Sequence, residues 1–117
     1  MKHSNLIIIN NEKISKEKFF FYCDNIDIKS IPENLNKNFD VKLIARRSNI
    51  KRDRKINIEN IEVASNIFMF LSRIIKTFRN KNALYLIISI TPYTFLSYLL
   101  LLFFKKKKFH LFKKQWI

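Results

Sequence analysis

Glycine is missing from this 117-residue sequence, although it makes up about 7% of the residues in an average protein. A loop that wraps a phosphate group needs glycine, because the chain turns tightly there and its backbone approaches the ligand closely. The sequence therefore excludes a Walker-type phosphate loop, and it excludes the glycine-rich fingerprint of dinucleotide-binding domains as well.

Cysteine and histidine, the usual ligands of structural zinc, are also scarce. Cys23 is the one cysteine in the sequence, so no disulfide can form within the chain and a reducing compartment is expected. His3 and His110 lie far apart, and neither has a cysteine or a carboxylate at the spacing of a metal ligand. We therefore expect neither a metal site nor a bound cofactor.

Acidic residues are few, and this leaves a large positive charge. The chain has 9 Asp and Glu residues against 23 Lys and Arg residues, which gives a formal net charge of +14. Such a charge favours anionic partners, namely nucleic acid, phosphorylated substrates or an acidic membrane surface. A second explanation stays open. Ile, Asn, Lys and Phe are all used heavily, as in proteins from AT-rich genomes, and some lysines then serve only to solvate the surface.

The N-terminal segment lacks the apolar run of a signal peptide. Within Met1–Asn11 the apolar run Leu6–Ile9 is too short for that role. The chain has the length of one domain, and its hydrophobic content of 48% argues against a disordered tail. We expect a folded cytoplasmic protein, with peripheral binding to the inner face of the membrane as a further expectation.

The longest uncharged segment, Ala83–Phe104, contains 22 residues and stops at Lys105–Lys108. One interpretation is a transmembrane helix. At about 1.5 Å per residue it would extend about 33 Å, enough to cross a hydrocarbon core of about 30 Å. The chain would then be a small single-pass membrane protein with a basic cytosolic domain.

The other interpretation divides the same segment at a proline. Ala83–Ile90 is continuously apolar, as a buried parallel strand should be, and Phe95–Phe104 would form a helix. Thr91 can cap that helix, and Pro92 suits its first turn, because the first N–H groups of a helix have no partner there. We prefer this strand–turn–helix interpretation and keep the transmembrane helix as the alternative.

Short apolar runs separated by polar segments predict the remaining elements. A helix begins near Ser65, where apolar residues recur at three- and four-residue steps and indicate a stripe that faces the core. A shorter helix is expected over Ser30–Asn36, with Ser30 as its cap. The charged segment Arg46–Lys55 predicts an exposed loop, and Asn11–Lys18 predicts another. Strands are expected over Asn5–Ile9, Phe19–Cys23, Phe39–Ala45, Ile56–Ile61 (at an edge) and Phe109–Phe112.

The alternation of strands and helices predicts an α/β fold. We expect a mainly parallel, Rossmann-like sheet with covering helices, formed as a single domain by residues 5–112. Residues 113–117 follow the last expected strand without any capping element, and we interpret them as a truncated end.

Sheets of this kind place their binding sites beyond the carboxyl ends of the strands. Arg46 and Arg47 follow a predicted strand, and their guanidinium groups there can hold a phosphate or an anionic acceptor, although a solvated loop explains them too. Asp24 and Asp27 are explained better by a strand-end turn than by acid–base catalysis, and no catalytic residue is assigned. The candidate acceptor or phosphate contacts are Asn10, Asn11, Arg46, Arg47, Thr91 and Tyr93.

Residues 85–111, YLIISITPYTFLSYLLLLFFKKKKFHL, resemble the strand–Pro–helix–strand unit in the N-terminal domain of bacterial GT-B glycosyltransferases. In that unit a strand ends in a short polar loop with proline, an apolar helix follows, basic residues close it and the next strand begins. Residues 21–48, FYCDNIDIKSIPENLNKNFDVKLIARRS, and the helix after Ser65 also fit that domain. The resemblance covers Asn5–Leu111, although the glycine-rich turn that usually follows the first strand is missing here.

The resemblance implies the acceptor-side half of a glycosyltransferase, which transfers a sugar from a nucleotide-sugar donor to a glycan or lipid-linked acceptor, as in polysaccharide biosynthesis. In this family a second domain binds the donor, so this half alone would not transfer a sugar. Lys105–Lys108 would face anionic lipid, because such transferases often act on lipid-linked or surface polysaccharide acceptors. Nucleic-acid binding through Arg46–Lys55 is our least favoured alternative, because no recognised fold motif accompanies the charge.

Overall fold

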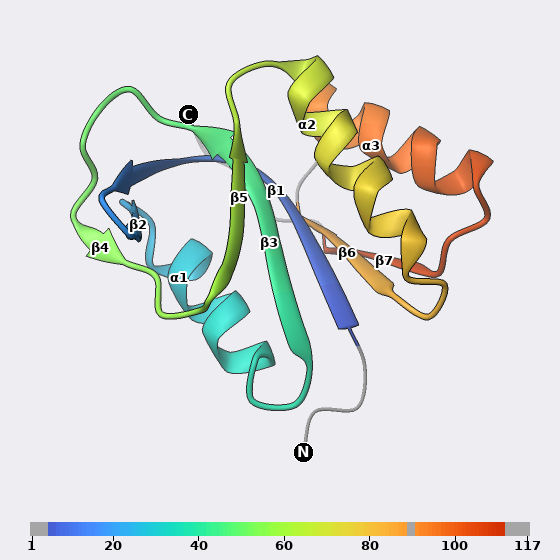
Figure 1. The fold of residues 1–117 in the computed structure, drawn as a ribbon, viewed down its shortest axis with the longest axis horizontal. Helices are drawn as coiled ribbons and strands as arrows, with labels where there is room; N and C mark the ends of the chain where they lie inside the picture. Colours follow the sequence, from blue (N-terminus) through green and yellow to red (C-terminus); the bar gives the residue numbers. More distant parts are fainter. Residues whose placement is uncertain (1–4, 89–90, 112–117) are drawn as a thin grey trace.

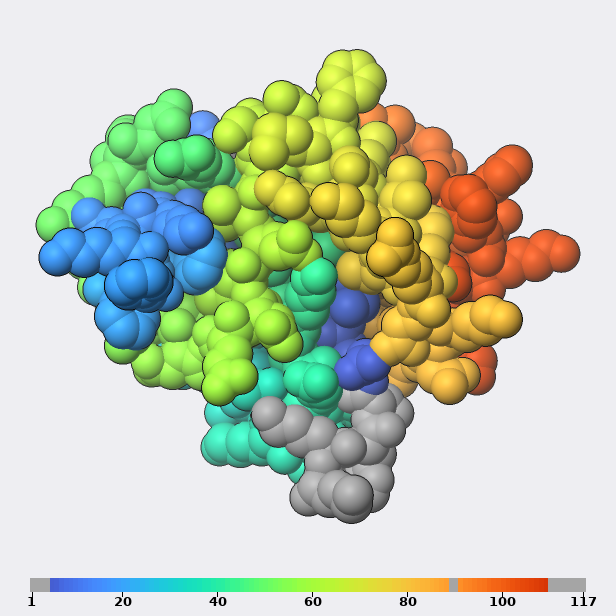
Figure 2. Space-filling view, viewed as in Figure 1, coloured from blue at the N-terminus to red at the C-terminus, as the bar shows by residue number. Residues whose placement is uncertain are grey.

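A computed structural model describes residues 5–88 and 91–111 as a compact α/β protein with a mixed sheet (Figure 1). Figure 2 shows the same view with all atoms as spheres. Residues 113–117, the predicted truncated end, lie outside the described residues, and so does His3. The helices are α1 (Ile26–Leu35), α2 (Ile67–Lys76), the 3-10 helix η1 (Thr77–Arg79) and α3 (Pro92–Phe103). The strands are β1 (Asn5–Glu17), β2 (Phe20–Cys23), β3 (Asp40–Arg47), β4 (Arg54–Lys55), β5 (Asn60–Ala64), β6 (Leu84–Ile88) and β7 (Lys108–Leu111).

The sheet combines a parallel part with an antiparallel extension. β1 pairs in parallel with β3 on one side and with β6 on the other, while β5 pairs in parallel with β3 and β7 with β6. The carboxyl end of β1 leaves this arrangement and pairs antiparallel with β2, which pairs antiparallel with β4. The predicted α/β class is confirmed, but the sheet is mixed. We expected a mainly parallel sheet, because the sequence patterns did not indicate the antiparallel pairing of β1, β2 and β4.

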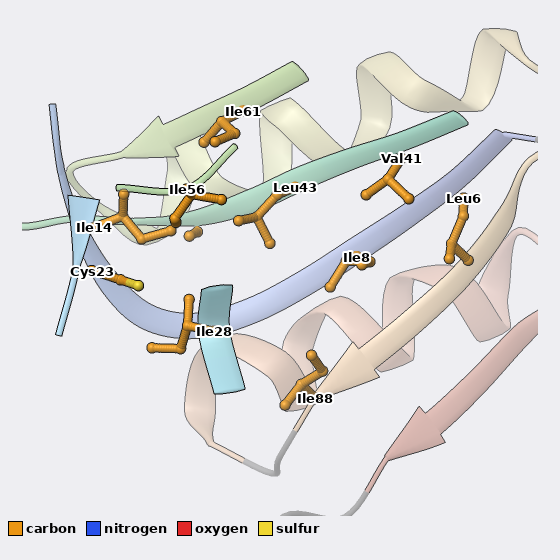
Figure 3. Close-up of a cluster of buried hydrophobic side chains, with 11 residues drawn as sticks. Leu6, Ile8, Ile14, Cys23, Ile28, Val41, Leu43, Ile56, Ile61 and Ile88 are labelled. Carbon is orange, nitrogen blue, oxygen red and sulfur yellow. The ribbon is translucent and has the colours of Figure 1, made fainter. Parts of the chain in front are cut away.

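β1 is longer than its sequence indicated. We expected a loop over Asn11–Lys18, but the strand continues to Glu17 after a shift in its pairing with β3. Ile14 accounts for the continuation, because the extended chain buries its side chain completely in an apolar cluster, near Cys23 (Figure 3). Lys18 then adopts a φ of 55°, and the chain turns back into β2. That left-handed conformation costs roughly 1–2 kcal/mol for a residue other than glycine.

Asparagine side chains cap the first two α-helices, and the cap of α1 is not the residue that we expected. α1 is capped by Asn25, whose side-chain oxygen accepts a backbone N–H at 2.8 Å, and not by Ser30. The predicted start of α1 was therefore wrong. α2 is capped in the same way by Asn66, the residue after the predicted start at Ser65. Asparagine is as good a helix cap as serine, since its short side chain reaches the same free N–H groups.

The uncharged segment Ala83–Phe104 contains a strand and a helix, β6 and α3. Thr91 Oγ1 accepts the Thr94 backbone N–H at 3.2 Å, and Thr94 Oγ1 accepts the Thr91 backbone N–H at 2.8 Å. Pro92 occupies the first position of the helix. The strand–turn–helix prediction is confirmed. Within residues 5–88 and 91–111, no helix has both the length and the apolar character needed to cross a membrane.

The segment Arg46–Lys55, which we expected to be one exposed loop, is divided among several structures. Its first residues belong to β3 and its last residues to β4. Between them, the Arg52 backbone N–H donates to Ser15 Oγ at 3.0 Å, and the Arg52 guanidinium group pairs with the Asp24 carboxylate. The prediction of a single exposed loop was wrong, because these polar contacts anchor its middle against β1 and the end of β2.

Two apolar clusters hold the helices against opposite faces of the sheet. α2 and α3 lie side by side over one face, where Phe70, Ile74 and Leu101 are fully buried (Figure 1). On the other face, Ile28 of α1 packs in the second cluster (Figure 3). Buried members of the α1 cluster include Leu6, Ile8, Ile14, Ile28, Val41, Leu43 and Ile88.

Candidate functional site

The carboxyl ends of the parallel strands meet at one edge of the sheet. In the register of the sheet, Asn10 of β1 pairs with Ile88 at the end of β6, and Arg46 of β3 pairs with Ala64 at the end of β5. α2 and α3 both start near this edge, because α2 follows β5 and α3 follows β6. The fold thereby brings the predicted positions on β1, β3 and α3 to one edge.

Arg46 and Tyr93 are two predicted site residues that the fold places in contact. The guanidinium carbon of Arg46 lies 4.3 Å from the centre of the Tyr93 ring, which is a stacking distance. Tyr93 packs edge-on against Phe70 of α2, with ring centres 5.2 Å apart and ring planes at 87°. Phe70 is fully buried. The core therefore holds the Tyr93 ring in place, and the Tyr93 ring in turn contacts the Arg46 guanidinium group. Phe70 belongs to the apolar stripe that the sequence predicted to face the core, but the sequence carried no signal for this supporting contact.

The Arg46 guanidinium group is half-buried and has no carboxylate partner among the described residues. When a guanidinium group stacks on an aromatic ring, its N–H donors remain in its own plane and can bind a planar anion at two points. The amino ends of α2 and α3 lie near the same edge, and helix dipoles are positive at that end. The edge is therefore electrostatically suited to an anionic group.

Arg47 does not join Arg46 in this arrangement. Successive residues of a strand point to opposite faces of the sheet, so the two side chains diverge. Arg47 pairs with Ile14 in the strand register and is exposed, whereas Arg46 is half-buried. The two predicted arginines therefore do not form a double clamp around one ligand.

The two asparagines on β1 have different environments. Asn10 is buried, and its side-chain oxygen accepts the Glu12 backbone N–H at 3.0 Å, where the pairing of β1 with β3 shifts. Asn11 is half-buried, and no donor among the described residues reaches its side-chain oxygen. We therefore assign Asn10 a structural role in the local conformation of β1, and Asn11 stays a candidate ligand contact.

Thr91 lies at the same edge, but the helix cap engages its hydroxyl group. Thr91 Oγ1 accepts the Thr94 backbone N–H and also lies 3.1 Å from Thr94 Oγ1. Thr94 is fully buried, so this pair is part of the packing of α3. The contribution of Thr91 is to start α3 where Tyr93, two residues later, reaches Arg46.

The lysines that follow α3 do not form a uniform basic surface. Lys106 folds back onto Phe78, with its Nζ atom 4.9 Å from the ring centre and 3.5 Å from the backbone carbonyl oxygen. Lys108 donates to the backbone carbonyl of Lys106 at 3.3 Å. Lys105 and Lys107 are exposed. Two of the four predicted membrane-facing lysines therefore pack against the protein itself.

Three cavities of the molecule lie away from the arginine–tyrosine pair. One of about 220 Å³ opens beside the amino ends of β1, β3 and β5. One of about 370 Å³ lies near the connection between β4 and β5, and one of about 620 Å³ surrounds the ion pair of Arg52 and Asp24. None of the six predicted contact residues lines any of these cavities.

The ionisable groups with raised pKa values are buried in the core and are not among the predicted contact residues. Burial raises the pKa of the Cys23 thiol, and burial likewise raises the pKa of the Tyr85 hydroxyl group, which hydrogen-bonds to Thr77. Within the part of the chain that the structure describes, no three His, Cys, Asp or Glu side chains gather as metal ligands would. Among the described residues, this edge thus offers a cation and an amide to a ligand.

Comparisons with known proteins identify no family for this chain. No family model matches the sequence, and no curated protein or solved structure matches it either. Its function must therefore be inferred from the residues and their arrangement.

Proposed function

We propose that these 117 residues form the acceptor-binding, Rossmann-like half of a GT-B-type glycosyltransferase, whose acceptor is a glycan or a lipid-linked sugar. The observation that carries the proposal is the stacked pair of Arg46 and Tyr93 at the carboxyl edge of the sheet. The resemblance assigns the nucleotide-sugar donor to a second domain. The proposal for this chain is therefore limited to acceptor binding.

The order of the strands supports a Rossmann-like interpretation. From β1 the chain adds β3 and β5 on one side of the sheet, and then returns to add β6 and β7 on the other. In open α/β sheets, ligands bind beyond the carboxyl ends of the strands at the point where the strand order reverses. Here that point lies between β1 and β6, next to Asn10 and Asn11 and to the first turn of α3, which carries Tyr93.

The chemistry of Arg46 supports an acceptor with an anionic group near its reacting end. Arg46 has no carboxylate partner among the described residues, and its guanidinium group lies over the Tyr93 ring. A phosphate of a lipid-linked sugar and the carboxylate of an acidic glycan both match two parallel N–H donors. Asn11 would add an amide that can bind a sugar hydroxyl group.

The test is a titration of the isotope-labelled protein, followed by ¹H–¹⁵N NMR. The anionic probes are 3′-sialyllactose and N-acetylglucosamine linked to a short prenyl pyrophosphate; lactose and free N-acetylglucosamine are their neutral controls. We expect an anionic probe to shift the resonances of Asn11, Arg46 and Tyr93, and its neutral control to bind much more weakly. The probe that binds distinguishes a glycan carboxylate from a lipid phosphate as the anionic group.

Two neighbouring arginines supply a matched pair of variants. Arg46→Gln should weaken binding of the anionic probe by about tenfold or more, since a hydrogen bond to a charged group contributes about 1.5–3 kcal/mol. Arg47→Gln removes the same charge from the exposed neighbouring residue and should change the affinity by less than about twofold. Equal losses in the two variants, or no shift at this edge with any probe, would overturn the proposal.

A further inference from the structure

The outer surface of α3 is more apolar than the surface that it turns toward the sheet. Its buried residues are Thr94, Ser97 and Leu101, of which two are polar. In an ordinary surface helix the apolar stripe faces the core and polar residues face solvent, so the pattern here is inverted. The exposed large apolar residues of the helix, called here the α3 surface, are Phe95, Leu96, Leu99, Leu102 and Phe103.

Packing within the protein explains why small polar residues lie on the inner side of α3. The Ser97 hydroxyl group donates to the Tyr93 backbone carbonyl at 2.8 Å, and Thr94 belongs to the helix cap. Small side chains whose hydroxyl groups bond within the helix allow a close approach to the sheet without leaving unpaired polar groups. No such account applies to the outer side, where Phe103 is 80% exposed and Phe95 is 51% exposed. A contiguous apolar patch of this kind indicates a binding surface.

The charge of the same region indicates what kind of surface binds there. All 9 acidic residues lie at or before Glu62, whereas ten of the 23 Lys and Arg residues follow it. α3 projects at the right of the molecule in the view of Figure 2, and exposed Lys105 and Lys107 come directly after its last turn. The α3 surface is therefore apolar, lies in a segment without carboxylates and is followed by two exposed cations.

We propose that the α3 surface inserts into the interface of an anionic lipid bilayer, with the helix parallel to the membrane plane and Lys105 and Lys107 among the lipid headgroups. An amphipathic surface of apolar residues beside lysines binds such an interface by burying apolar area and by attracting anionic lipid. A second copy of the chain is the less suitable occupant, because the α3 surface that it would present offers no acidic group to Lys105 and Lys107. The proposal concerns membrane docking and does not depend on acceptor binding.

The test is sedimentation of the full chain with unilamellar vesicles. We expect the protein to sediment with vesicles of phosphatidylcholine containing 30% phosphatidylglycerol, and to remain in the supernatant with phosphatidylcholine alone. Binding should weaken as salt is added, because salt screens the attraction between the lysines and the headgroups. Equal partitioning to both kinds of vesicle, or no partitioning to either, would overturn the proposal.

Matched variants separate the apolar contribution from the charge contribution. Phe103→Ser should weaken binding about tenfold or more, whereas Phe19→Ser should have little effect, although Phe19 at the turn after β1 is 88% exposed. Replacing both Lys105 and Lys107 with Gln should weaken binding about fivefold for each lysine. The control replaces exposed Lys13 and Lys37 with Gln, which changes the net charge equally. An equal loss in the variants and their controls would contradict docking through α3.

A spin label gives a second measurement that does not depend on sedimentation. Because Cys23 is buried, a nitroxide reagent should label an added cysteine selectively. On anionic vesicles, a label on Leu99→Cys should become accessible to oxygen and shielded from a water-soluble nickel complex, whereas a label on Phe19→Cys should remain in water. Concentration-dependent dimers that form without lipid and that Phe103→Ser abolishes would make a second copy the occupant and refute the membrane proposal.

Discussion

α1 and α3 cover opposite faces of the same sheet, and their outward sides differ in chemistry. On α1, the Lys29 ammonium group binds the Glu33 carboxylate at 2.6 Å and the Lys55 backbone carbonyl at 3.0 Å. Glu33 also accepts the Asn57 backbone N–H at 2.7 Å, so polar groups on α1 are paired with the segment beside it. α3 has no acidic residue and exposes a row of apolar side chains.

The two helical layers therefore differ in how their outward sides are stabilised: ion pairs within the chain hold the polar groups of α1, whereas apolar side chains of α3 are exposed. Every carboxylate in the ion pairs lies at or before Glu62, where it stabilises α1, the loop around Arg52, the pairing of β3 with β5 or the last turn of α2. The region beyond Glu62 has cations and apolar groups without acidic partners of its own. The exposed apolar side chains of α3 and the exposed lysines after it are the basis of the membrane proposal.

The largest expected effect would test whether α3 really has an inner and an outer side. Leu101→Ala should lower the free energy of unfolding by about 2–5 kcal/mol, because Leu101 is fully buried and its loss leaves a cavity. The same substitution at the next residue, Leu102→Ala, should cost less than about 1 kcal/mol, because that side chain is half exposed. Urea unfolding followed by circular dichroism measures both. Similar losses would mean that both sides of α3 are packed, and the comparison with α1 would fail.

A smaller effect would test the polar network of α1. Burial of the Glu33 carboxyl group raises its pKa, but hydrogen bonds from Lys29 and Asn57 outweigh burial, so the pKa lies below the ordinary value of 4.5. Glu33→Gln should therefore lower the free energy of unfolding by about 1.5 kcal/mol at neutral pH. Because the folded pKa is lowered, the contribution of Glu33 is complete above pH 4.5 and is lost as the pH falls through its folded pKa.

The pH series is measured by urea unfolding of the wild type and of Glu33→Gln between neutral pH and acid. The two stability curves should converge below pH 4.5. Glu59→Gln serves as the control, because Glu59 is exposed and takes no part in the ion pairs of the described residues. A constant difference between wild type and Glu33→Gln across this range would show that the carboxylate charge does not stabilise α1.

The smallest expected effect is a gain in stability when glycine replaces a residue with positive φ. The gain should be similar before β2 and after α3. Lys18 before β2 and Lys105 after α3 both have a φ of 55°, a conformation that glycine adopts without steric cost. Lys18→Gly and Lys105→Gly should each raise the free energy of unfolding by about 0.5–1 kcal/mol, since the larger flexibility of glycine in the unfolded chain offsets part of the gain. Lys13→Gly, within β1, should instead destabilise the protein. Destabilisation by all three would show that the lysine side chains matter more than the backbone conformation.

Lysine at these two positions is a consequence of the missing glycine. After α3 the backbone N–H of Lys105 donates to the Leu102 carbonyl at 3.1 Å, and that of Lys106 donates to the Leu101 carbonyl at 2.9 Å. This is the Schellman pattern of helix ends, which usually contains glycine at the residue with positive φ. The bonds form here without glycine, so the chain accepts local strain to end the helix.

Signals that act within a few residues were sufficient to predict β6 and α3. The apolar run after Ala83, the hydroxyl group of Thr91 and the fixed φ of Pro92 all act locally, and the structure has the predicted strand, cap and helix. The same kind of reasoning failed for α1, where Ser30 and Asn25 are both good caps. Burial of Cys23 at the end of β2 decides where the chain leaves the strand, and this makes Asn25 the cap. The residues next to Asn25 in the sequence do not indicate which of the two caps is used.

The candidate site was predictable as a set of positions and not as a set of contacts. Strand ends placed Asn11, Arg46 and Tyr93 at one edge, because parallel strands share their carboxyl direction. The separation of Arg47 from Arg46 also follows from strand alternation, once both residues are known to lie in β3. The stacking of Arg46 on Tyr93 needs two segments that are far apart in the sequence to meet at 4.3 Å.

The sequence by itself determined the class of fold, the split of its longest uncharged segment and the large positive charge. These properties depend on composition and on patterns a few residues long. Only the tertiary structure decided that β1 extends through Ile14, that Tyr93 rests on Phe70 beneath Arg46, and that α3 turns its hydroxyl groups inward. α3 is apolar on nearly every side, so no periodicity in its sequence selects a buried face. The small residues Thr94 and Ser97 face the sheet because they permit close packing there, and the larger side chains are left outside.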